Sequence, residues 1–127
     1  MSRWLIGVGV NGAIGVAMGA WAAHGAAAIL ELPELEWVRT GSSYQLWHAV
    51  ALLGVAALVQ RTPSRSLGVV GFCFCFGALA FSGSLYLLAL VGWHWVVWLT
   101  PLGGAAMLAG WIVLILYGLV SWRGSLS

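Results

Sequence analysis

Apolar residues along this chain form four long runs, separated by short segments that hold the charges. The runs cover residues 4–24, 43–60, 67–91 and 101–122. Each run has about 18 to 25 residues, close to the ~20 that an α-helix needs to cross a ~30 Å hydrocarbon layer. A membrane β-barrel would instead require alternating polarity. The pattern therefore predicts an all-α fold, a single integral membrane domain over residues 1–127 that forms an antiparallel, up-down four-helix bundle.

Charge is scarce and unevenly placed. The chain has 127 residues, five basic and three acidic, with a net charge of +2. Four arginines share one side of the predicted bundle: Arg3, Arg61, Arg65 and Arg123. The other side holds only Arg39 and the three glutamates. Since basic residues are retained on the cytoplasmic side, both termini are predicted to be cytoplasmic. No basic cluster suits nucleic acid, so no such partner is expected.

The first run and the tryptophans agree with this layout. The first apolar run is longer than the core of a usual signal peptide, so we expect it to remain as a membrane span. Tryptophan prefers the boundary between membrane and water. All nine tryptophans except Trp111 fall near the predicted boundaries, and Trp111 falls near mid-membrane.

The connection between the first two runs has its own helical signals. Residues 33–39 begin with a proline, which suits the first turn of a helix, and carry acidic residues near that end. We expect a short interfacial helix here, lying flat on the outer surface and ended by Gly41. Ser42 and Gln45 have the spacing of a capping box, which places the start of the second span close to Ser42.

Small residues in the first span repeat at every fourth position. The row consists of Gly7, Asn11, Gly15, Gly19 and Ala23. Helices in lipid associate through close contact between small residues and through polar pairing. The row is therefore expected to face another helix, with the Asn11 amide bonded across that interface in a structural role rather than to a ligand.

Polar side chains gather near the predicted outer ends of the spans. The candidate ligand-binding residues are His24, Tyr44, Gln45, His48, Ser82, Ser84, Tyr86 and Thr100. Tyr44 and His48 lie four residues apart and so share a helix face. An ionisable group within a span is a functional candidate. This suggests a membrane-embedded binding or carrier protein with an outer pocket for a small polar or lipid ligand. In the competing interpretation, a neutral His48 simply bonds Tyr86 or Ser82 on a neighbouring helix.

Other functions have less support from the residues. Histidines from different helices could bind a metal or haem, but no close cluster favours this, and that hypothesis ranks last. The stretch at residues 82–84 lacks a nucleophile elbow, and the chain contains no aspartate. No catalytic residue, metal or cofactor is therefore predicted, and a non-enzymatic role is favoured. The main alternative is a structural or accessory subunit of a larger membrane complex, with membrane lipids, other subunits or further copies of the chain as partners.

Four motifs lie in order at residues 19–25, 40–48, 81–90 and 100–104, with Gly110 and Trp111 following. Together they resemble the YgdD-like family of small bacterial inner-membrane proteins. The resemblance covers nearly the whole chain. All eight candidate residues lie in these motifs, His24 in the first and the other seven in the second to fourth. The resemblance implies four spans and a bacterial inner (plasma) membrane location. The family is classed as a domain of unknown function and has small eukaryotic transmembrane relatives. It therefore implies no established activity. The chain departs from it in a short middle loop and in frequent tryptophan near the outer face.

Overall fold

The computed structural model describes residues 2–127, and every regular element within that range is helical. The long helices are α1 (Ser2–His24), α2 (Leu32–Arg61), α3 (Arg65–Leu90) and α4 (Leu99–Ser125). Two short 3-10 helices, η1 (Ala26–Ala28) and η2 (His94–Trp98), lie in the connections. All four long helices are long and apolar enough to cross a membrane. The predicted all-α membrane bundle is confirmed.

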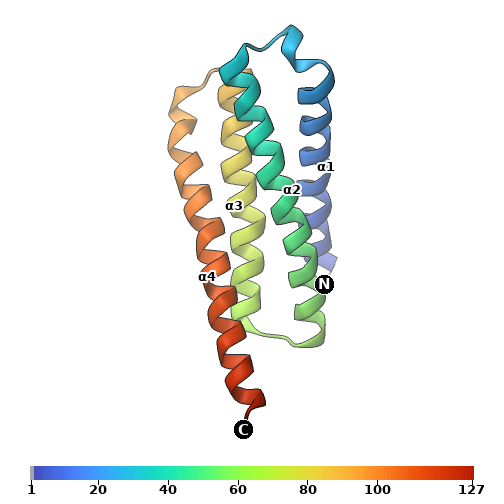
Figure 1. The fold of residues 1–127 in the computed structure, drawn as a ribbon, viewed down its shortest axis with the longest axis vertical. Helices are drawn as coiled ribbons and strands as arrows, with labels where there is room; N and C mark the ends of the chain where they lie inside the picture. The colour runs from blue at the N-terminus through green and yellow to red at the C-terminus, as the bar shows by residue number, and fades with distance from the viewer. Residues whose placement is uncertain (1) are drawn as a thin grey trace.

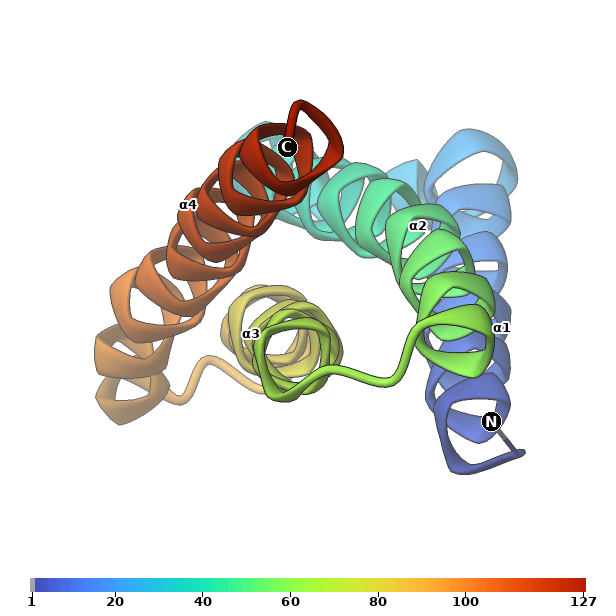
Figure 2. The same ribbon diagram turned by 90° about the horizontal axis from the view of Figure 1, so that it is seen from below.

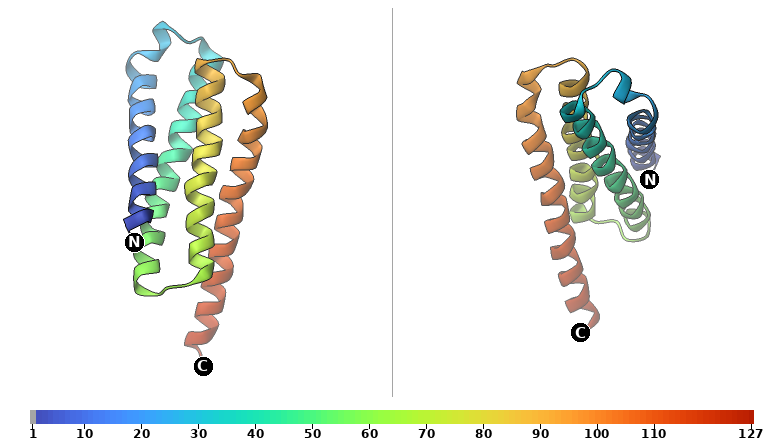
Figure 3. Two further views of the ribbon diagram at one scale, coloured as in Figure 1. Left: turned by 180° about the vertical axis from the view of Figure 1, so that it is seen from behind. Right: turned by 45° about the horizontal axis from the view of Figure 1, so that its top comes forward.

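The long helices run up and down in chain order (Figure 1). Helix α1 packs mainly on α2, α2 on α3, and α3 on α4. Viewed along the bundle, α1 and α4 lie at opposite edges (Figure 2). Both termini and the short connection between α2 and α3 lie toward one end, and α4 extends past its neighbours there (Figure 3). The bundle is thus an open, curved row of helices. Which end faces the cytoplasm stays a prediction from the arginines.

Helix α3 ends at a glycine with a specific backbone requirement. Gly92 has a φ of 74°, a conformation that side chains disfavour. Its N–H approaches the carbonyls of Leu87 and Leu88, each at 3.2 Å. The Val91 N–H bonds the same two carbonyls, so Val91 and Gly92 together satisfy the last acceptors of the helix. Beyond η2, Pro101 lies in the first turn of α4, where its missing N–H costs nothing.

The short interfacial helix predicted at residues 33–39 is wrong as a separate element. These residues form the first turns of α2, which continues unbroken to Arg61. Gly41 does not end the helix, because it is buried against α3, where an added Cβ would lie 2.8 Å from the Tyr86 ring. Ser42 does not cap the helix, because its hydroxyl bonds α1 instead. Glycine and serine therefore serve packing between helices here.

The predicted row of small residues on α1 does face the other helices over most of its length. An added Cβ would lie 2.8 Å from Cys75 Sγ at Gly7, 2.9 Å from Leu46 at Gly15 and 2.6 Å from Ser42 Oγ at Gly19. Only Ala23, at the end of the row, is exposed. Close approach of α1 to its neighbours therefore depends on the absence of side chains at these glycines.

Buried apolar residues form two clusters at different heights of the bundle. The cluster near the α1–α2 connection contains Ala22, Ala26, Leu35, Val38, Tyr86 and Ala89. The cluster toward the termini contains Leu52, Val55, Val70, Phe74 and Cys75. Between these clusters lies a layer of buried polar residues, which connects all four helices.

Candidate functional site

A chain of buried hydrogen bonds joins the first three helices. Tyr86 Oη donates to Gln45 Oε1 at 2.8 Å, and Gln45 Nε2 donates to Asn11 Oδ1 at 3.1 Å. Asn11 Nδ2 in turn donates to the carbonyls of Gly7, at 3.0 Å, and Cys75, at 3.5 Å. Asn11 and Gln45 are each only 1% exposed. In a lipid setting, where unpaired polar groups are costly, this chain ties α1, α2 and α3 into one arrangement.

Two serine hydroxyls reach backbone carbonyls on neighbouring helices. Ser42 Oγ donates to the carbonyl of Gly15 on α1 at 2.7 Å, and Ser82 Oγ donates to that of Gly41 on α2 at 2.6 Å. Both acceptors are buried glycines. Because these glycines have no side chain to separate the helices, each serine comes close enough to bond the backbone opposite.

The third and fourth helices are joined by a pair of hydroxyls. Ser84 Oγ lies 2.8 Å from the carbonyl of Phe81 and 2.5 Å from Thr100 Oγ1. Since Ser84 can donate to the carbonyl, Thr100 can supply the proton between the two hydroxyls. Ser84 is 2% exposed, so its hydroxyl is occupied within the protein.

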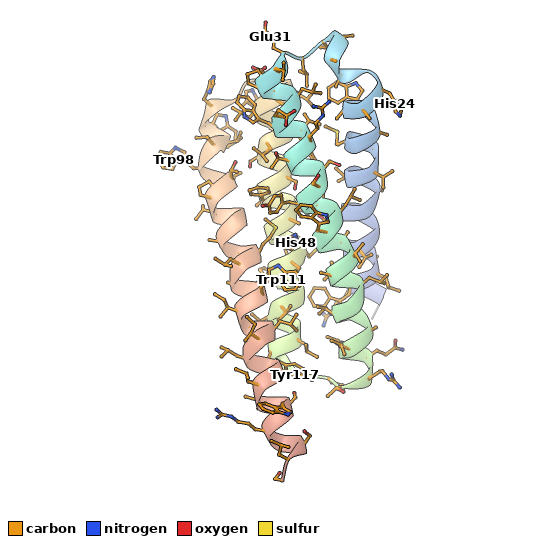
Figure 4. The ribbon with its side chains drawn as sticks, in the orientation of Figure 1. His24, Glu31, His48, Trp98, Trp111 and Tyr117 are labelled. Atoms are coloured by element: carbon orange, nitrogen blue, oxygen red, sulfur yellow. The ribbon has the colours of Figure 1, made fainter. Side chains whose placement is uncertain are left out.

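His48 connects α2 to α4 as a neutral imidazole. Trp111 Nε1 donates to His48 Nε2 at 3.0 Å, while His48 Nδ1 lies 2.8 Å from the carbonyl of Tyr44. An indole N–H only donates, so Nε2 is the acceptor and Nδ1 carries the proton. The His48 and Trp111 side chains face each other midway along the bundle (Figure 4). His48 lies about 13 Å along α2 from Arg39 at the helical rise of 1.5 Å per residue.

A groove beside this pair opens between α2, α3 and α4. We call it the His48 groove; it encloses about 310 Å³. It is lined by Tyr44, His48, Phe81, Gly104, Met107, Leu108 and Trp111. The Tyr44 ring lies 5.0 Å from that of Phe81, so an aromatic wall forms one side. Within residues 2–127, the Tyr44 hydroxyl bonds no other protein group.

The predicted binding residues do not share one pocket. Tyr44 and His48 lie together in the His48 groove. Gln45, Ser82, Ser84, Tyr86 and Thr100 bond other parts of the protein. His24 lies exposed at the end of α1, on the far side of the bundle (Figure 4). The alternative pairing of His48 with Tyr86 or Ser82 is wrong, because its partner is Trp111.

Sequence reasoning missed Trp111, Phe81 and Met107 as groove residues. The sequence position of Trp111 could have indicated its role, since it alone among the tryptophans falls away from the predicted membrane boundaries. Phe81 and Met107 are ordinary apolar residues whose inclusion depends on how α3 and α4 meet. Within residues 2–127, no group of three or more histidines, cysteines or acids is placed to hold a metal ion.

Four membrane-spanning helices with a polar layer at mid-height define a small multi-pass membrane protein. The chain belongs to the family whose model is described as "Protein of unknown function (DUF423)", which matches residues 18–104. It is similar to a UPF0382 membrane protein of Haemophilus influenzae, 42% identical over 89% of this chain and 90% of the relative. It is also similar to the UPF0382 inner membrane protein YgdD of Escherichia coli, 38% identical over 87% of this chain and 85% of the relative.

A third relative is less similar in sequence but is matched over as much of the chain. A UPF0382 membrane protein of Staphylococcus saprophyticus is 33% identical over 91% of this chain and 96% of its own length. No solved structure matches the chain. The resemblance to YgdD-like proteins is thereby confirmed, and the protein is a multi-pass protein of the bacterial inner membrane, in contact with lipid.

Proposed function

We propose that the protein is a membrane-embedded binding protein whose ligand occupies the His48 groove. The ligand class is a small amphiphile, with an apolar body against the aromatic wall and one hydrogen-bonding group. The observation that carries this proposal is Tyr44, which lines the groove, is 39% exposed, and has a hydroxyl that bonds no protein group within the described residues. Polar groups surrounded by lipid gain from a partner, and a ligand would supply one.

The remaining polar groups narrow the ligand class. His48 and Trp111 already bond each other, and the other candidate hydroxyls and amides are bonded within the bundle. A strongly polar ligand would have to break several of these bonds to bind. An amphiphile with a single polar group needs only the Tyr44 hydroxyl, which favours a lipid-like ligand over a small polar one.

Native mass spectrometry of the protein extracted from its own membranes in gentle detergent tests this proposal. The wild type is expected to retain a small amphiphilic molecule. Gly104→Leu should abolish its retention, because Gly104 lines the groove and an added Cβ lies at ordinary contact distance, 3.7 Å, from Phe81. Gly83→Leu is the matched control, since its Cβ would project into open space on α3, away from the groove.

Tyr44→Phe separates the polar contact from the shape of the groove. It preserves the aromatic wall and removes only the hydroxyl, so retention should fall, whereas Tyr117→Phe outside the groove should have no effect. A wild type that carries no small molecule would contradict the proposal, as would equal retention by Gly104→Leu and Gly83→Leu. Stoichiometric partner subunits on a chain without ligand would support the accessory-subunit role instead.

A further inference from the structure

A second and larger groove lies between α1 and α3, and it shares no residue with the His48 groove. It encloses about 560 Å³. Its apolar lining includes Trp4 and Ile6 from α1 and Phe72 and Phe76 from α3. The rings of Phe72 and Phe76 lie 4.6 Å apart and form one wall. We call it the Arg3 groove, because Arg3 is the one charged residue in its lining.

The Arg3 guanidinium is a cation without a carboxylate partner. It lies over the Trp4 ring, 5.9 Å from the ring centroid. The one salt bridge among residues 2–127 joins Arg39 to Glu36, and all three glutamates of the chain lie between residues 31 and 36, at the opposite end of the bundle. No acidic side chain of the protein therefore neutralises Arg3. An anion that reaches this end of the groove gains a bidentate partner.

The groove covers most of the depth of one leaflet of a bilayer. Arg3 lies in the first turn of α1 and Gly68 in the first turn of α3, both toward the end of the bundle that holds the termini, whereas Phe76 lies near the middle of α3. The lining residues of α3 run from Gly68 to Phe76, which is about 12 Å at the helical rise of 1.5 Å per residue and most of the ~15 Å that one leaflet contributes to a ~30 Å hydrocarbon layer. An acyl chain lying along Ile6, Phe72 and Phe76 would therefore bring its headgroup to the level of Arg3.

We propose that the Arg3 groove is a binding site for one anionic glycerophospholipid of the leaflet at this end, which the arginine distribution predicts to be the cytoplasmic one. The acyl chain packs against the apolar lining, and the phosphate bonds the Arg3 guanidinium. Charge complementarity and the length of the groove carry this assignment. The positive charge of Arg3 selects an anionic headgroup. The aromatic wall makes only apolar contacts, so it can pack against acyl chains of different lengths.

Competition between two lipids in native mass spectrometry tests the site. The purified protein is incubated with equimolar phosphatidylglycerol and phosphatidylcholine that carry identical acyl chains. The wild type should retain phosphatidylglycerol preferentially. Arg3→Gln should lower this preference about fivefold, the factor that corresponds to ~1 kcal/mol for one basic residue near an anionic surface. Arg123→Gln is the matched control, because Arg123 lies at the same end of the bundle, in the exposed last turns of α4 and outside the groove.

A second pair of variants tests the groove itself. Gly68 lines the groove, and an added Cβ would meet no atom within 4 Å, so Gly68→Leu fills the groove without disturbing the fold. It should lower retention of both lipids. Gly54→Leu also projects into open space, from α2, and should lower neither. The proposal is overturned if the wild type shows no preference, if Arg3→Gln behaves as Arg123→Gln does, or if Gly68→Leu retains lipid as well as Gly54→Leu.

Discussion

Single polar residues decide how the helices of this protein are joined. Gln45 is the central example, because its amide accepts from Tyr86 on α3 and donates to Asn11 on α1. If Gln45 were removed, the Tyr86 hydroxyl would lose its acceptor and the Asn11 carbonyl oxygen would lose its donor, both in an apolar setting. Hydrogen bonds between membrane helices contribute modestly on average, about 0.6 kcal/mol with a maximum near 1.7, because polar groups also find partners in the unfolded state.

The Tyr86 bond gives a direct prediction. Tyr86→Phe keeps the ring that packs against Gly41 and removes the donor to Gln45. We expect the free energy of unfolding in detergent to fall by about 0.5 to 2 kcal/mol. Reversible unfolding monitored by circular dichroism would measure this. Tyr117→Phe is the control, since Tyr117 takes part in none of these bonds, and equal stability of the two variants would show that the Tyr86 bond contributes nothing.

At the scale of elements, the α3–α4 contact depends on backbones that nearly touch. Gly103 faces α3, where an added Cβ would lie 2.8 Å from the Phe81 Cα and from the Gly77 carbonyl. Unlike a flexible side chain, these backbone atoms cannot rotate away. The buried residues of α4 are only Gly103, Met107 and Gly110, so this narrow strip holds the helix in place.

Alanine substitutions of glycines inside and outside this strip should therefore distinguish the effect of packing on stability from the effect of helix propensity. Gly103→Ala is expected to destabilise the protein by about 1 to 3 kcal/mol, the usual cost of overpacking, despite the better helix propensity of alanine. Gly118→Ala on the same helix meets no atom within 4 Å and should be neutral or stabilising by up to ~1 kcal/mol. Thermal unfolding in one detergent compares the two. A Gly103→Ala variant as stable as Gly118→Ala would contradict the close contact.

At the scale of the whole molecule, charge separates the two ends of the bundle. One end carries the glutamates and Arg39, and the other carries the remaining four arginines. This asymmetry predicts the orientation in the membrane through the retention of basic residues in the cytoplasm. It also underlies the lipid site proposed at Arg3, because an end without acidic side chains leaves its arginines available to phosphate.

Orientation can be measured with a membrane-impermeant thiol reagent on spheroplasts. Glu31→Cys, in the exposed α1–α2 connection, should be labelled on intact spheroplasts, and Ser127→Cys only after they are permeabilised. The native Cys73 and Cys75 lie within α3, where Cys73 is partly exposed and Cys75 is buried, and the unmodified chain provides the background signal. The reverse pattern, with Ser127→Cys labelled first, would place the termini outside and move the Arg3 groove to the outer leaflet.

The sequence by itself determined the four helices, their antiparallel order and the interface of α1, because these follow from local hydrophobicity and from residues at fixed spacing along one helix. Only the tertiary structure decided that His48 bonds Trp111, a residue 63 positions away, and that Gly41 packs against Tyr86 inside a continuous α2. Such pairs depend on how far each helix is rotated about its axis and how far it is shifted along that axis relative to its neighbour. Those quantities are set by the packing of all four helices together, which no segment of the chain specifies alone.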